Sequence, residues 1–506
     1  MLRKIRIVVS LSIFVLTTIY FLDFSGIIPH QLHAITHLQF IPALLGLHTG
    51  VIIALILITF VFGRVYCSSV CPLGVYQDII TWFSKKIRKT KRFKFSPALN
   101  ILRWSVIVVT LIAFLFGFTF LLGLLDPYSA FGRMTVHIFK PAYLAGNNLL
   151  ETIFTQFNNH TFYKVSIYIL SVSTLIIALI TLLSVSTLAW VNGRIYCNTI
   201  CPVGTVLGFV SRVSILKIRI DNDLCNSCGT CGRKCKASCI DTKSRQIDYS
   251  RCINCFDCIE VCSQDAVKFR YAKSITNTNT PKVVNESKRR FMIALGVTTL
   301  AAGKALADKT LLNSSLKNKA IRETPISPPG SKSHEHLLGK CTSCHLCVSK
   351  CPSGVIKPAF AEYGLGGIMQ PMLNFDKGFC NYDCTICSEI CPTGAIQPLT
   401  IEQKHITQTG EVHFIKENCI VYTDETFCGA CSEHCPTQAV SMVPYKNGLT
   451  IPYTETSICV GCGGCEYVGP SKPCKAIFVE GILSHKNIVI THDKKDESIK
   501  VDDFGF

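Results

Sequence analysis

The sequence predicts an α-helical membrane domain of four transmembrane helices, built as a duplicated two-helix unit, followed by two α+β domains organised around cysteine motifs. Three observations support this prediction. The 506-residue chain is 48% hydrophobic and has four long apolar runs in its first 191 residues. Two nearly identical segments, at 63–74 and 193–204, each follow one of these runs. Most of the 29 cysteines stand in short, closely spaced motifs.

The apolar runs are the candidates for membrane spans within a domain at 1–215. They cover residues 7–22, 42–62, 104–125 and 165–191. About 20 apolar residues cross the hydrocarbon core of a bilayer as a helix, so three runs are long enough and the first is shorter. A buried core helix would give the same pattern for any single run. Four runs that alternate with basic loops favour a membrane domain.

The basic residues predict the orientation of these spans. The N-terminus, the 63–103 loop with seven basic residues at 85–94, and the segment just after residue 191 are basic, whereas 23–41 and 126–164 carry far fewer such residues. Basic loops stay on the cytoplasmic side. We therefore expect a multi-pass protein of the cytoplasmic (inner) membrane.

The duplicated segments read Gly-Arg-Val-Tyr-Cys-Ser-Ser-Val-Cys-Pro-Leu-Gly and Gly-Arg-Ile-Tyr-Cys-Asn-Thr-Ile-Cys-Pro-Val-Gly. Each places a Cys-x3-Cys-Pro pair at a cytoplasmic helix end: Cys67 with Cys71, and Cys197 with Cys201. Thiols four residues apart can share one helix face and are available for redox chemistry or metal ligation. Buried structural thiols are the alternative, but duplication of the whole context favours a redox role.

Residues 216–271 contain two motifs, Cys225-x2-Cys228-x2-Cys231-x3-Cys235 and Cys252-x2-Cys255-x2-Cys258-x3-Cys262. This is the spacing of bacterial two-cluster ferredoxins, in which the fourth cysteine of each motif binds the other cluster. One [4Fe–4S] group is then Cys225, Cys228, Cys231 and Cys262, and the other is Cys252, Cys255, Cys258 and Cys235. Eight thiolates at this repeated spacing make zinc the weaker interpretation. Cys239 is left over, and we expect it to be a packed thiol.

Four more motifs lie in 341–484, ahead of a polar tail at 485–506. They are Cys341-x2-Cys344-x2-Cys347-x3-Cys351, Cys380-x3-Cys384-x2-Cys387-x3-Cys391, Cys419-x8-Cys428-x2-Cys431-x3-Cys435 and Cys459-x2-Cys462-x2-Cys465-x8-Cys474. Sixteen thiolates suffice for four clusters. The chain is therefore predicted to hold six [4Fe–4S] clusters in two α+β ferredoxin-like domains, although the motifs alone do not fix which cysteines share a cluster.

The formal net charge of +18 would suggest nucleic-acid binding, but it leaves out the negative charge of the clusters. Four thiolates around an oxidised [4Fe–4S]²⁺ core carry −2 in total, so six clusters leave about +6. We therefore expect no nucleic-acid partner.

The linker at 272–340 contains a segment that is similar to a twin-arginine export signal. Residues 287–307 have a basic start with Lys288-Arg289, an apolar stretch and an Ala-x-Ala-like end. Export would place the second ferredoxin domain in the periplasm. A basic linker with one amphipathic helix is the alternative. Residues 308–340, with Pro325, Pro328, Pro329 and Gly330, are expected to form a flexible tether.

With these motifs, residues 1–270 resemble membrane quinol-dehydrogenase accessory proteins of the NapH type, which are related to NosR, MauN and CcoG proteins. Residues 287–480 resemble the exported four-cluster ferredoxins of the NapG type, so the chain is similar to a fusion of the two. The resemblance implies a quinol-oxidising module that passes electrons to a periplasmic reductase.

The second region is also similar to the DmsB and NarH type, where outer motifs share two clusters and inner motifs share two. That resemblance implies four groups: Cys341, Cys344 and Cys347 with Cys474; Cys459, Cys462 and Cys465 with Cys351; Cys380, Cys384 and Cys387 with Cys435; and Cys419, Cys428 and Cys431 with Cys391.

The function that these features favour is a membrane-bound iron–sulfur electron-transfer protein. Its expected partners are the membrane quinone pool and a redox protein, either a reductase or a cytochrome, and quinol dehydrogenase activity of its own is left open. The alternative is a metal-reducing or assembly factor of the CcoG type. His30, His33 and His37 could share a helix face and line a quinone or metal site, or be interfacial histidines with neither role.

Overall fold

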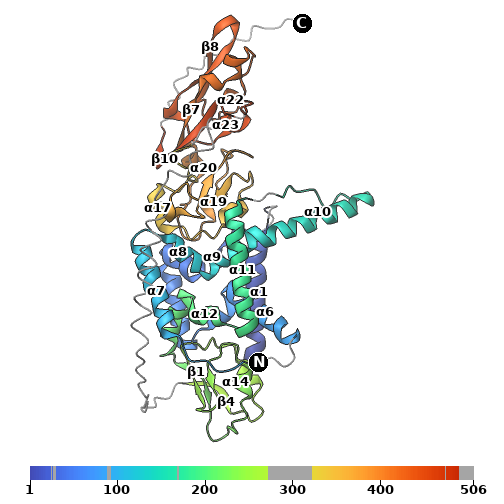
Figure 1. Cartoon of the computed structure of the whole chain (residues 1–506), viewed down its shortest axis with the longest axis vertical. Helices are drawn as coiled ribbons and strands as arrows, with labels where there is room; N and C mark the ends of the chain where they lie inside the picture. The colour runs from blue at the N-terminus through green and yellow to red at the C-terminus, as the bar shows by residue number, and fades with distance from the viewer. Residues whose placement is uncertain are drawn as a thin grey trace, which may run out of the picture.

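The computed structural model describes residues 1–23, 26, 30–87, 93–167, 170–271, 322–472 and 474–488. These residues form three parts along one long axis: a central helical domain, a first cysteine domain at one end and a second cysteine domain at the other (Figure 1). The export-signal prediction at 287–307 lies outside the described residues.

The helical domain contains two described helices that are long and apolar enough to cross a membrane, α1 and α11. The prediction of four spans is therefore confirmed only in part. The helices of this domain are α1 (Leu2–Leu22), α2 (Ala34–His37), α3 (Phe40–Leu45), α4 (Thr49–Phe62), α5 (Val65–Ser69), α6 (Pro72–Ile87), α7 (Asn100–Leu115), α8 (Thr119–Leu125), α9 (Pro127–Met134), α10 (Lys140–Gln156), α11 (Val172–Asn192), α12 (Ile195–Thr199) and α13 (Pro202–Ser211), with a 3₁₀ turn at His30–His33 and a π-helical turn at Thr135–Phe139.

The predicted spans at 42–62 and 104–125 are each broken into two helices. Leu47, between α3 and α4, has a φ of 56°, and Gly117, between α7 and α8, has a φ of 80°. Left-handed backbone cannot continue a right-handed helix. Both breaks lie against the second cysteine domain, because a Cβ on Gly46 would meet the carbonyl of Pro392, and one on Gly366 would meet the carbonyl of Gly117. A hydropathy profile cannot show these two breaks, because it carries no information on backbone φ angles.

The first cysteine domain consists of β1 (Leu216–Ile220), α14 (Thr230–Lys234), β2 (Ile240–Asp241), β3 (Gln246–Ile247), α15 (Asp257–Glu260) and β4 (Val267–Tyr271). β1 pairs antiparallel with β4, and β2 pairs with β3. Ile218 and Ile253 of this domain belong to the same buried core as Leu73 and Leu207 of the helical domain. The shared core fixes the two domains to each other.

The second cysteine domain contains three antiparallel strand pairs, β5 with β6, β8 with β9, and β7 with β10, the last with a bulge between Gly481 and Lys486. Its elements are α17 (His334–Lys340), α18 (Leu346–Lys350), β5 (Ile356–Pro358), β6 (Pro371–Leu373), α19 (Ile386–Glu389), α20 (Ile401–Ile406), β7 (Thr407–Phe414), α21 (Ile420–Thr423), α22 (Ala430–Glu433), β8 (Val440–Pro444), β9 (Thr450–Thr454), α23 (Gly464–Val468) and β10 (Ile477–Asn487), with 3₁₀ turns at Leu365–Gly367, Lys416–Asn418, Lys446–Gly448 and Thr456–Ile458.

The expected flexible tether does not extend over residues 322–340. Ile326 is fully buried and bridges to Leu373 of β6, and residues 326–331 are all buried. The prolines and Gly330, which suggested a tether, form a packed turn on the second domain instead. Composition cannot distinguish a packed proline-rich turn from a mobile one.

Helix α1 joins the two cysteine domains through its opposite ends. Near its start, Arg3 pairs with Asp257 of the first domain at 2.9 Å. At its end, the carbonyl of Phe21 accepts a hydrogen bond from Ser349 Oγ of the second domain at 2.6 Å, and Asp23 pairs with Lys350. A helix of this length spans about 30 Å, so the helical domain separates the two cysteine domains.

Candidate iron–sulfur centres

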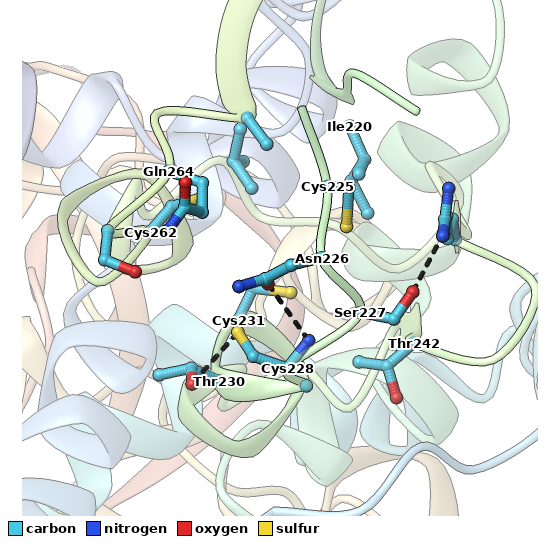
Figure 2. A pocket seen from close by; sticks show the side chains of 15 residues that line it. Ile220, Cys225, Asn226, Ser227, Cys228, Thr230, Cys231, Thr242, Cys262 and Gln264 are labelled. Carbon is cyan, nitrogen blue, oxygen red and sulfur yellow. Dashed lines mark hydrogen bonds between the residues drawn. The ribbon is translucent and has the colours of Figure 1, made fainter. Parts of the chain in front are cut away.

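The first cavity of the first cysteine domain is lined by four thiols. Cys225, Cys228 and Cys231 come from the loop that leads into α14, and Cys262 follows α15 (Figure 2). The sequence spacing groups the same four residues. Ile220, Ala266 and Val267 add apolar side chains to the lining, beside polar residues such as Thr230 and Thr242. Four thiols around one cavity match a [4Fe–4S] cluster, in which each thiolate binds one iron.

The second cavity of this domain is lined by Cys235, Cys252, Cys255 and Cys258, again the four that the spacing groups together. Cys239 lines the same cavity, and its sulfur lies 3.5 Å from that of Cys235. The spare cysteine is therefore a fully buried fifth thiol in contact with this group rather than part of a separate site.

In the second domain, the fourth cysteine of each motif joins the neighbouring motif. Burial, and then repulsion by Cys391 among nearby charges, raises the pKa of Cys344 to about 12. Burial, followed by repulsion from Cys380 and Cys351, raises the pKa of Cys387 well above its usual value. Cys391 therefore lies near the thiols of the first motif, and Cys351 lies near those of the second.

The last cysteines of the third and fourth motifs likewise lie near the other motif of the pair. Burial, and then repulsion by Cys459 and Cys435, raises the pKa of Cys462 to about 12. The cavity at the third motif, lined by Cys419, Cys428 and Cys431, is closed by residues 469–471 and 476, on either side of the fourth motif's last cysteine. Cys435 thus lies near the thiols of the fourth motif, and the chain on either side of Cys474 lies against those of the third.

The proximity of these thiols favours a pairing that differs from the one implied by the DmsB and NarH resemblance. Cys351 lies with Cys380 rather than Cys459, and Cys435 lies with Cys459 rather than Cys380. The motifs form two successive two-cluster units, at 341–391 and 419–474. The segment that forms α20 and β7 runs between them. Both pairings use the same motifs, so the spacing could not distinguish them.

The three-cysteine loops share a sharply bent backbone. In four motifs, the residues two and four places after the first cysteine have positive φ: Ser227 and Gly229, Asn254 and Phe256, Ser343 and His345, Gly461 and Gly463. Outside glycine this conformation costs of order 1–3 kcal/mol per residue. The bend lets the N–H of Ser343 donate to Cys341 Sγ and that of Gly461 to Cys459 Sγ, both at 3.4 Å. Such bonds stabilise thiolates and tune cluster potentials.

Across the described ranges, no three or more His, Cys, Asp or Glu side chains are grouped as they would be around one metal ion. The thiols of the first cysteine domain and of the third motif line cavities, and the sulfurs of Cys341 and Cys459 accept backbone hydrogen bonds. The residues present therefore fit [4Fe–4S] clusters, which supply one-electron redox chemistry when bound.

The four cysteines of the membrane repeats, predicted as two helix-end pairs, lie in one buried core. Cys67 and Cys197 lie on α5 and α12, and Cys71 and Cys201 directly precede α6 and α13; each is at most 4% exposed. Burial, and then the charges of neighbouring thiols of both repeats, raises the pKa of Cys71 and of Cys201 well above the usual value.

Two fully buried arginines cross between the repeats. Arg64 of the first repeat donates to the carbonyl of Cys197 at 3.1 Å, and Arg194 of the second repeat donates to the carbonyl of Cys67 at 2.8 Å. The last glycine of each repeat lies against the arginine of the other repeat. A Cβ on Gly74 would meet Arg194 and the carbonyl of Cys67, and one on Gly204 would meet Arg64 and the carbonyl of Cys197. Both duplicated segments contain these arginines and glycines, but a sequence pattern cannot show contacts that cross from one repeat to the other.

Asp78 of α6 connects the repeats to the first cysteine domain. Its carboxylate lies 2.7 Å from Arg194, 2.9 Å from Lys236 and 3.1 Å from Arg6. Burial alone would raise the pKa of Asp78, but the three cations hold it well below its usual range. Sequence reasoning missed this residue because a lone aspartate after a span gives no signal.

The histidines near the second domain form a contact among themselves. His37 Nε2 lies 3.3 Å from His33 Nδ1, and the His37 ring packs edge-on to His48 at 4.6 Å. The side chain of His30 lies outside the described residues. A quinone or metal role for these histidines stays a prediction.

Three sequence families match parts of the chain. One described as "4Fe-4S binding domain" matches residues 45–90 and 172–221, which contain the two Cys-x3-Cys-Pro repeats. Two described as "4Fe-4S dicluster domain" match 248–355 and 426–472. The match at 248–355 joins motifs that belong to different domains in the structure, whereas 426–472 falls within the second of the two units.

Several relatives share part of the chain. Ferredoxin-type protein NapH of Escherichia coli (strain K12) is 27% identical over 236 residues, which are 44% of this chain and 68% of that protein. Ferredoxin-type protein NapF of the same strain is 29% identical over 163 residues, 32% of this chain and 87% of NapF. An uncharacterized protein of Methanocaldococcus jannaschii is 25% identical over 278 residues, 54% of this chain and 95% of that protein. No solved structure matches the chain.

Motifs, cavities and relatives together define a ferredoxin-type protein that transfers electrons through several [4Fe–4S] domains. Within that class, the first half of the chain is similar to the ferredoxin-type proteins named NapH. The relation to NosR and MauN and the likeness of its second half to NapG remain predictions.

Proposed function

We propose that this protein carries electrons from the membrane quinone pool through its clusters to a redox partner protein, a reductase or cytochrome. The observation that supports the quinol step is a cavity of about 540 Å³ where the second cysteine domain meets the helical domain. Ligand sites of this kind measure about 300–1,000 Å³ and combine an apolar lining with a few polar groups.

The cavity lining suits a quinol ring. Leu144 of α10, Leu170 and Ile390 supply apolar surface, and Lys140 and Tyr20 supply polar groups. The cavity lies beside the predicted outer end of α1, within reach of the lipid phase in the proposed topology. A quinol could therefore enter with its tail in the membrane.

The polar groups match the chemistry of quinol oxidation. Conversion of a quinol to a quinone releases two electrons and two protons. Burial lowers the pKa of Lys140 to about 8, so a neutral amine that can accept a proton is accessible near physiological pH. Cys351 lines the cavity, and it belongs to the thiol group of the second motif, whose cluster would accept the electrons one at a time.

We further propose that four spans cross the membrane, with the first cysteine domain in the cytoplasm and the second in the periplasm. The attachment of the two domains at opposite ends of α1 supports this topology. The basic loops favour the same orientation. Export of the second domain would require the signal-like segment at 287–307.

A cavity-filling variant tests the quinol step. Leu144→Trp should slow cluster reduction by a short-chain quinol at least tenfold while leaving reduction by dithionite unchanged. Leu149→Trp is the matched control, because Leu149 lies on the same helix but is 63% exposed, against 8% for Leu144. Equal quinol rates in the two variants would remove this cavity from the mechanism.

A further inference from the structure

We propose that Cys67, Cys71, Cys197 and Cys201 hold a seventh [4Fe–4S] cluster inside the helical domain. These four thiols match in number and kind the ligand set of each ferredoxin-type site. They share one buried core, and the family described as "4Fe-4S binding domain" covers both pairs. The inference is independent of the quinol step.

Hydrogen-bond donors are directed at these sulfurs. Cys201 Sγ accepts the N–H of Gly204 at 3.3 Å in the first turn of α13. Gln77 Nε2 lies 3.2 Å from Cys197 Sγ, and Arg64 Nη2 lies 3.7 Å from Cys67 Sγ. Donors of this kind favour the thiolate form, which is the form that binds iron.

The buried positive charge at the site requires an anion. Arg64 is fully buried and bonds to neutral acceptors, Asn198 Oδ1 at 2.9 Å and the carbonyls of Ser250 and Cys197, with no carboxylate among its partners in the described residues. Its Nε and the Nη2 of Arg194 are buried without a hydrogen-bond partner there. Burying an uncompensated charge is strongly destabilising. A cluster with four thiolates carries −2 and supplies the missing charge.

The alternatives account for less of this site. Neutral packed thiols, or two disulfides, would leave the guanidinium of Arg64 without a counter-ion. A zinc ion with four thiolates would supply the charge. The family described as "4Fe-4S binding domain" covers both cysteine pairs and favours a cluster over zinc. Metal analysis separates the two.

The site lies between the two cysteine domains. On one side, the N–H of Arg194 donates to the carbonyl of Lys236, the neighbour of Cys235, at 2.9 Å. On the other side, Tyr196 donates to the carbonyl of Leu125 at the end of α8. The neighbouring helix α9 contacts the second cysteine domain, where its Arg133 donates to the carbonyl of Ser343, the neighbour of Cys344. A one-electron carrier here, reduced as a neighbouring cluster is oxidised, would connect the two domains across the helical domain.

Metal analysis of the full-length protein, purified anaerobically in detergent, tests this inference. Seven clusters predict about 28 iron and 28 sulfide per chain. Cys67→Ser combined with Cys197→Ser should lower both to about 24 and remove one spin per chain from the electron paramagnetic resonance spectrum of the reduced protein. Ser69→Ala, a change between the two thiols of the first pair, is the matched control and should keep all seven clusters.

Two results would overturn the proposal: a wild-type content of about 24 iron, or one zinc per chain that disappears in the double variant. If the double variant loses more than four iron because it folds poorly, the wild-type iron and spin counts alone decide. None of these measurements uses quinol, so failure of the quinol step leaves them intact.

Discussion

Removal of the Asp78 carboxylate should loosen the junction between the repeats, α1 and the first cysteine domain. In Asp78→Asn, three cations, Arg194, Lys236 and Arg6, lose the carboxylate they share. The side chains of Arg194 and Lys236 are at most 7% exposed, so water cannot replace that charge. Breaking a buried pair by removing one partner costs about 3–5 kcal/mol.

The pH dependence of this contribution follows from the lowered pKa of Asp78. A carboxylate whose pKa is lower in the folded than in the unfolded chain stabilises the fold fully above its unfolded pKa of about 3.9. The stabilisation is lost as the pH falls through the folded value. At neutral pH the variant should therefore show the full cost.

Thermal unfolding at neutral pH, followed by loss of cluster absorbance in detergent, measures the effect. At about 2–4 °C per kcal/mol, Asp78→Asn should lower the midpoint by roughly 6–20 °C. Asp265→Asn is the control, since Asp265 pairs with Lys268 but is 76% exposed, and such surface pairs contribute about 0–1 kcal/mol. Equal midpoints in the two variants would refute the reasoning.

Two further predictions concern cluster pairing and topology. Cys341→Ser combined with Cys391→Ser changes two ligands of one cluster and should remove about four iron per chain. Cys341→Ser combined with Cys474→Ser changes ligands of two clusters and should remove about eight. The opposite result would support the pairing in which Cys474 shares a cluster with Cys341. With cysteine-free tags at residues 275 and 506, an impermeant protease added to spheroplasts should remove only the tag at 506, and protection of both tags would end the export hypothesis.

The sequence predicts local ligand sets better than it predicts partners across the fold. The two ferredoxin-type groups of the first domain follow from motif spacing, and Figure 2 shows one of them around its cavity. The proximity of Cys351 and Cys391 to neighbouring motifs did not follow, because both pairings are compatible with the same motif spacing. The broken helices at Leu47 and Gly117 were missed since hydropathy averages over a window and is blind to a single positive φ.

The duplication gives the thiol site a property that neither repeat has alone. Arg64 and Arg194 each bond the cysteine carbonyl of the opposite repeat, and each lies over the opposite repeat's glycine. A single repeat would therefore leave its guanidinium without the carbonyl acceptor that the other repeat supplies. The two halves must consequently dock for either cysteine pair to reach its final position. Assembly of the helical domain and formation of the four-thiol site are thus one event, completed next to the first cysteine domain.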